Sequence, residues 1–71
     1  MRAHRYQITI MGSLGPVAQE MFEDFKIESN RRHTYLIADL DQAGLYGALN
    51  RIQSIGLELI ELTRMAGPGP A

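Results

Sequence analysis

Apolar and polar residues alternate with a period of two in four segments of the chain, and this alternation predicts four β-strands. The segments are residues 5–11, 25–28, 33–38 and 57–65. In the first of them, Tyr6, Ile8 and Ile10 share one face. Residues 29–32, between the second and third segments, include Asn30, which tolerates positive φ, so they predict the turn of a hairpin.

Two further segments have apolar residues at helical spacing. The first follows Pro16, which suits the first turn of a helix, and its apolar stripe begins with Val17. The second follows Asp41, a good N-cap, and ends before Gly56, a residue that favours a left-handed helix end. Its stripe consists of Leu45, Ala48, Leu49, Ile52 and Ile55. Tyr46 lies beside this stripe, where it would either line a ligand pocket or pack on a neighbouring subunit.

The resulting order of elements is βαββαβ, which predicts a ferredoxin-like α+β sandwich. In this fold the four strands form one antiparallel sheet in the order 4-1-3-2, and both helices pack on one face. Residues 1–65 are expected to form a single domain. Residues 66–71 consist of Gly, Pro and Ala with few side chains to bury, so we expect a disordered C-terminal tail.

The sheet face away from the helices is predicted to carry large apolar side chains. Because alternate residues of the third strand face the helices, Tyr35 and Ile37 face outward. In the last strand, Ile60 and Leu62 are expected to face inward and Leu59 outward. Burying these groups against a second chain would stabilise a complex, so we expect a homo-oligomer, with a dimer as the simplest case. Its interface would contain Tyr35, Ile37 and Leu59. The alternative is that they are scattered surface residues without a role.

Composition excludes several classes of protein. The chain has 71 residues, no cysteine and a net charge of −1, so disulfides, thiolate chemistry and cysteine-ligated zinc are ruled out. The charge balance provides little attraction to nucleic acid or to an anionic membrane. The most apolar segment, residues 57–62, contains two glutamates and is too short to span a bilayer. The N-terminal segment lacks the continuous apolar run of a signal peptide, so we expect a cytoplasmic protein.

One anion site is predicted where the first strand ends near the turn of the hairpin. A glycine-rich turn before a helix offers backbone N–H groups, and guanidinium groups would lie beside it. The candidate residues are Gly12, Ser13, Gly15, Arg31, Arg32 and His33. The alternative is a solvated hairpin tip next to a purely structural turn.

No catalytic set, metal site or cofactor is predicted. His4 and His33 begin antiparallel strands from opposite ends of the sheet, so one metal ion would not reach both. An RNA-recognition-like single-strand binder shares the strand order, and Tyr35 with the nearby arginines favours it. The absence of an aromatic-rich signature and the negative net charge argue against nucleic acid.

Residues 36–60 are similar to one half of an ACT domain. Asp41 and Gly44 lie where that family has an aspartate-to-glycine turn, and Gly56 lies where it has a glycine after the helix. The resemblance implies a domain that self-associates and binds small molecules, often amino acids, at turns between subunits. Such domains usually regulate an attached enzyme, which here would have to be a separate polypeptide. Residues 41–64 are also similar to a run found in small actinobacterial proteins of unknown activity.

The leading hypothesis is therefore a non-enzymatic, ACT-like homo-oligomeric module that binds a small anionic or amino-acid ligand or another protein. The alternative is a small dimeric αβ enzyme with a cleft between sheet and helices. An enzyme would place an ionisable group in that cleft. The inward positions of this chain are instead Ile, Leu, Val and Met.

Overall fold

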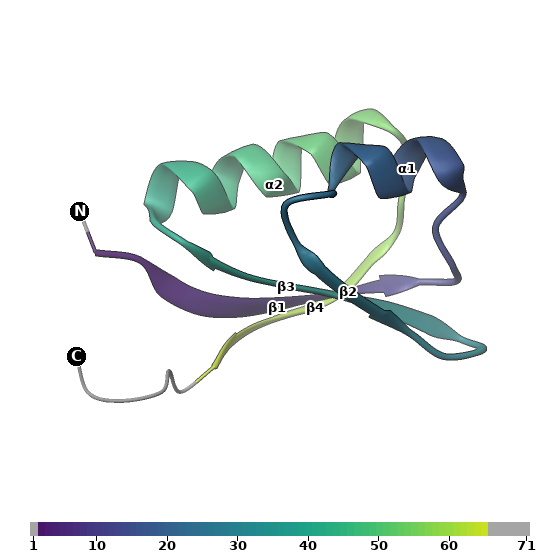
Figure 1. Cartoon of the computed structure of the whole chain (residues 1–71), viewed down its shortest axis with the longest axis horizontal. Helices are drawn as coiled ribbons and strands as arrows, with labels where there is room; N and C mark the ends of the chain where they lie inside the picture. The colour runs from purple at the N-terminus through teal and green to yellow at the C-terminus, as the bar shows by residue number, and fades with distance from the viewer. Residues whose placement is uncertain (1, 66–71) are drawn as a thin grey trace.

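The computed structural model describes residues 2–65, so the tail predicted at 66–71 lies outside the described residues. The elements are β1 (His4–Met11), α1 (Pro16–Met21), β2 (Lys26–Ser29), β3 (His33–Leu40), α2 (Gln42–Ser54) and β4 (Leu59–Met65). They form one four-stranded antiparallel sheet in the order β2-β3-β1-β4. Both helices lie on the same face of this sheet (Figure 1). The predicted α+β fold and strand order are confirmed.

The strand register decides which side chains meet the helices. β1 pairs with β3 along its whole length, from His4 opposite Leu40 to Met11 opposite His33. Ile8 lies opposite Leu36 in this ladder, and both side chains are fully buried beneath the helices. The buried apolar core consists of Ile8, Ile10, Leu14, Phe22, Phe25, Leu36, Ala48 and Ile52. The alternate residues Tyr35 and Ile37 of β3 therefore lie on the sheet face away from the helices, as predicted. We call this face the open face.

Both ends of α2 have the local structure that the sequence predicts. At the start, the Asp41 carboxylate accepts a hydrogen bond from the Gly44 N–H at 2.7 Å. At the end, Gly56 has φ +76°, and the Leu57 N–H donates to the Ile52 carbonyl at 3.1 Å. This pattern is a Schellman motif, in which a left-handed glycine lets the last helical carbonyls find donors. The following segment turns back toward the sheet and leads into β4 (Figure 1).

The first helix is shorter than a regular amphipathic helix, and one expectation about it is wrong. Val17, expected in its apolar stripe, is 70% exposed. The core-facing side of this six-residue helix carries Ala18 and Met21, three residues apart, and Val17 lies outside that side. Phe22 follows α1 and anchors it, packing edge-to-face on Phe25 with ring centroids 5.3 Å apart. The Arg51 guanidinium of α2 lies over both rings and donates to the Met21 carbonyl at 2.6 Å.

Within residues 2–65, no helix combines the length and apolar character needed to cross a bilayer.

Candidate functional site

The glycine-rich turn of the predicted anion site lies next to the hairpin residues Arg32 and His33. The Gly12 N–H donates to the Arg32 carbonyl at 2.7 Å, and Met11 pairs with His33. The turn after β1 therefore lies against the β2–β3 hairpin, as the topology requires. Asn30 shapes the hairpin, because its side-chain oxygen accepts from the N–H groups of Arg32 at 2.8 Å and His33 at 2.9 Å.

The local geometry gives this region a turn-forming role. Gly12 has φ +79°, a left-handed conformation that favours glycine. The helix after it has six residues, with Gly15 at the N-cap and Pro16, which has no N–H, in the first turn. The Gln19 side chain donates to the Leu14 carbonyl at 3.0 Å and ties the loop to α1. The anion site involving Gly12, Ser13 and Arg31 stays a prediction.

The open face of the sheet carries Tyr35 and Ile37, and charged side chains surround them. Both are half-buried rather than exposed. Ile37 lies opposite Lys26 of β2, and beside it Arg5 and Asp39 form a two-point ion pair. Arg5 Nε donates to one carboxylate oxygen at 2.9 Å and Nη2 to the other at 3.3 Å. This hydrogen bond lowers the pKa of Asp39 below its ordinary value and raises that of Arg5.

Leu59 does not lie on this face, so the predicted outward orientation of Leu59 is wrong. The β1–β4 register shifts between Thr9 and Ile10, so that Glu61 lies opposite Thr9 but Leu59 lies opposite Ile10. Ile10 is buried on the helix side, and Leu59 shares that side. The extra residue of a β-bulge reverses the alternation on which the expectation rested.

Leu62 lies opposite the buried Ile8 and so faces the helix side as predicted, but Leu62 and its neighbours Leu59 and Ile60 are exposed and not sheltered by the helices. The exposed fractions are 43% for Leu59, 43% for Ile60 and 38% for Leu62. Within the described residues, the apolar core and the side chains packed against it include no residue of β4. The helices therefore shelter the middle of the sheet and leave this edge strand uncovered.

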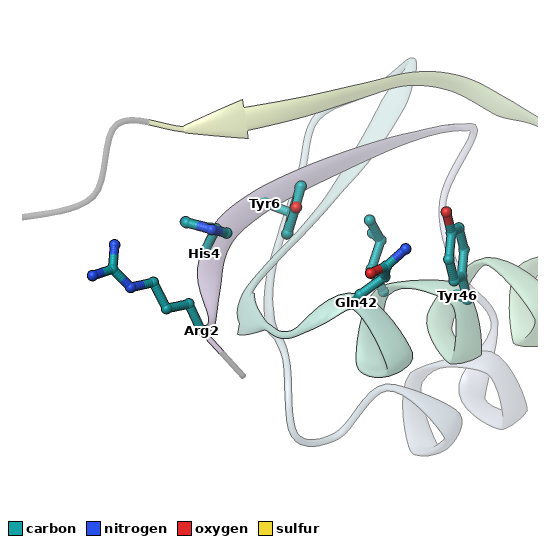
Figure 2. Close-up of a pocket in the computed structure, with 6 residues that line it drawn as sticks. Arg2, His4, Tyr6, Gln42 and Tyr46 are labelled. Atoms are coloured by element: carbon teal, nitrogen blue, oxygen red, sulfur yellow. The ribbon is translucent and has the colours of Figure 1, made fainter. Parts of the chain in front are cut away.

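A cavity of about 400 Å³ lies on the helix side, between the N-terminal halves of β1 and α2. It is lined by Arg2, His4, Tyr6, Gln42, Leu45 and Tyr46. Figure 2 shows Gln42 and Tyr46 rising from α2 toward β1, with Arg2 at the outer end beside His4. Arg64 of β4 reaches the same place, since its Nη2 lies 3.0 Å from His4 Nδ1.

Of the residues that line this cavity, the sequence predicts only Tyr46 as a candidate pocket residue. A signal for two others exists in the sequence: His4 and Tyr6 continue the inward positions of Ile8 and Ile10, but they have polar tips where a core residue would be apolar. Inward-facing residues with polar tips are typical of the part of a strand that extends beyond the buried core. His4 and His33 lie at opposite ends of the β1–β3 ladder, as expected. Within residues 2–65, no group of three or more His, Cys, Asp or Glu side chains is placed to hold a metal ion.

Comparison with protein families gives one match. A model described as Domain of unknown function (DUF8691) matches residues 5–63, from the beginning of β1 to near the end of β4. No curated protein and no solved structure matches the chain.

Proposed function

The chain belongs to the DUF8691 family, a domain of unknown function, and we propose that it is a non-enzymatic, ACT-like module that pairs with a second copy of itself through the outer edge of β4. The observation that carries this proposal is the exposure of three large apolar side chains, Leu59, Ile60 and Leu62, in the edge strand β4. This proposal places the interface at the edge of the sheet, whereas the sequence predicts it on the open face.

The two edges of the sheet differ in how they are protected. A free strand edge presents N–H and C=O groups that invite pairing, and proteins protect such edges with short length and charged residues. β2 has both protections, because it has four residues and carries a Lys26–Glu28 ion pair at 3.3 Å. β4 has seven residues and three large exposed apolar side chains. Of the two, β4 is the edge suited to pairing.

A second copy fits this edge because antiparallel pairing of β4 with itself is self-complementary. In a two-fold arrangement centred on Leu62, that residue lies opposite its own copy, and Ile60 lies opposite Arg64. In this register, the residues that lie opposite each other in the two β4 strands point to the same face of the combined sheet. The helices of both copies therefore lie on one face of that sheet. The result is a continuous eight-stranded sheet.

The energy available favours this pairing. Full burial of a Leu or Ile side chain contributes about 1.5–3 kcal/mol, and each of these three retains roughly two-fifths of its exposure. Covering the remainder contributes about 1 kcal/mol per side chain. Three such side chains from each copy, with a new ladder of backbone hydrogen bonds, give several kcal/mol to offset the cost of association.

The interior of the fold supports a role without catalysis. Among the described residues, the buried polar side chains are Thr9 and Thr34, and neither titrates in the range that general acid–base chemistry uses. The space between sheet and helices is filled by Ile, Leu, Phe and Ala. We propose that the module acts by binding, either to a ligand or to a separate protein.

Sedimentation velocity over a range of protein concentrations tests the self-association. We expect wild type to sediment as a dimer and Leu62→Glu as a monomer, because the new carboxylates would face each other across the edge. Val17→Glu is the matched control, since Val17 is more exposed but lies on α1. Ile37→Lys on the open face should also leave the dimer intact. A monomeric wild type, or a dimer disrupted by Ile37→Lys and not by Leu62→Glu, would contradict the proposal.

A further inference from the structure

The cavity between α2 and β1 is lined by residues of β1 and α2 and by Arg2, and among the described residues its lining includes none from β4, the strand proposed to pair. From its size, walls and charge, we propose that it binds a small anionic molecule with a planar apolar body. The carboxylate or phosphate of that molecule would lie at the outer end of the cavity, where Arg2 is part of the lining and Arg64 contacts His4.

The volume and the walls favour a small planar ligand. The cavity of about 400 Å³ is within the range of roughly 300–1,000 Å³ that is usual for small-molecule sites. Leu45 is a buried apolar wall residue, and Tyr6 and Tyr46 contribute two aromatic rings from opposite elements. Aromatic side chains pack favourably against a flat apolar body, and the Gln42 amide can donate to or accept from its polar substituents.

The charge of the lining selects an anion. Arg2 lines the cavity, and the Arg64 guanidinium is fixed at its margin by the 3.0 Å contact with His4. The six lining residues of the described chain include no carboxylate. The nearby Asp41 carboxylate already accepts from the Gly44 N–H at the start of α2. Guanidinium groups pair with carboxylate and phosphate through two parallel hydrogen bonds, which gives such a site its selectivity.

Titration of ¹⁵N-labelled protein, followed by amide chemical shifts, tests this site with benzoate and benzamide. The two probes share ring and size but differ in charge. We expect benzoate to shift the amides of His4, Tyr6 and Tyr46, and benzamide to bind at least about tenfold more weakly because it lacks the charge-assisted hydrogen bonds. Phenyl phosphate in place of benzoate shows which anionic group is preferred, and inorganic phosphate alone should bind more weakly than either because it lacks the ring.

Two arginine variants separate a site from a general charge effect. Arg2→Gln should weaken benzoate binding about tenfold and leave benzamide unchanged. Arg31→Gln removes the same charge at the hairpin turn and should change neither. Repeating the titration on Leu62→Glu separates this inference from self-association, because a monomer that still binds benzoate supports the site by itself. The inference is overturned if benzoate and benzamide bind equally, if the shifts centre on the hairpin, if Arg2→Gln has no effect, or if no shifts occur.

Discussion

Thr9 and Thr34 are buried on neighbouring central strands, but only one of their hydroxyls is hydrogen-bonded. Thr34 Oγ1 donates to the Gly12 carbonyl at 2.7 Å and so fastens the turn after β1 to β3. Thr9 Oγ1 is buried on the open face and makes no hydrogen bond to any described atom. Burying a hydroxyl removes its hydrogen bonds to water, and without a partner no hydrogen bond in the protein offsets that loss of free energy.

Replacing each threonine by valine should therefore have opposite effects. Thr9→Val should raise the free energy of unfolding by up to about 1 kcal/mol, because it removes an unsatisfied group. Thr34→Val should lower it by about 1–2 kcal/mol, because the Gly12 carbonyl loses its donor. Urea unfolding of both variants measures the difference. Equal destabilisation by the two substitutions would show that the Thr9 hydroxyl has a partner after all.

The Arg5–Asp39 ion pair gives the stability of the protein a specific dependence on pH. The pKa of Asp39 is lowered in the folded chain from its ordinary value of 3.8, mainly by the hydrogen bond from Arg5. As the pH falls, the Asp39 carboxylate is therefore protonated at a higher pH in the unfolded chain than in the folded chain. The pair contributes stability above the ordinary pKa and loses that contribution as the pH falls through the lowered pKa.

Asp39→Asn measures this contribution. The variant should be less stable than wild type at neutral pH, and the gap should narrow as the pH falls through and below 3.8. We expect a small effect, because the Asp39 side chain is 57% exposed and the Arg5 side chain 38% exposed, so solvent screens the pair. Chemical unfolding at a series of pH values follows the gap. In an Arg5→Gln background the same substitution should give no pH-dependent difference, and a difference that persists there would contradict this explanation.

At the scale of the elements, the features that could be predicted from the sequence are those specified by neighbouring residues. Asp41, Gly56 and the hairpin residue Asn30 act on backbone atoms within a few positions, so their residue types suffice to predict a cap, a helix end and a turn. The βαββαβ order follows from the same local patterns. The cap, the helix end, the turn and this order are confirmed, although Asn30 forms its turn through side-chain hydrogen bonds and not through a positive φ.

The features that could not be predicted depend on how elements meet. The bulge that moves Leu59 to the helix side arises from the pairing of β4 with β1, and no glycine or proline marks it. Likewise, the apolar spacing predicts that Val17 is buried, but α1 turns Ala18 and Met21 toward the core and leaves Val17 exposed. The cavity beside His4 and Gln42 depends on the spacing of β1 and α2, which neither segment specifies alone.

At the scale of the whole molecule, the sheet is wider than the helix layer that covers it. One helix of thirteen residues and one of six shelter the core strands, while β4 extends the sheet beyond that cover. A chain of this size buries only about 60% of its unfolded surface, so its core is thin. Adding a second copy at the β4 edge would enlarge the sheet and cover the exposed leucines and isoleucine.

Amide hydrogen exchange of wild-type protein at low and at high concentration tests the central claim, that β4 is the edge through which two copies pair. Pairing gives the outward-facing amides of β4 acceptors that they lack in the separate chain. We predict that the β4 amides exchange more slowly as the concentration rises, while those of β2, the short and charged edge, exchange at an unchanged rate. Exchange in β4 that is independent of concentration, or added protection that falls on β2 or the open-face residues of β3, would contradict the account.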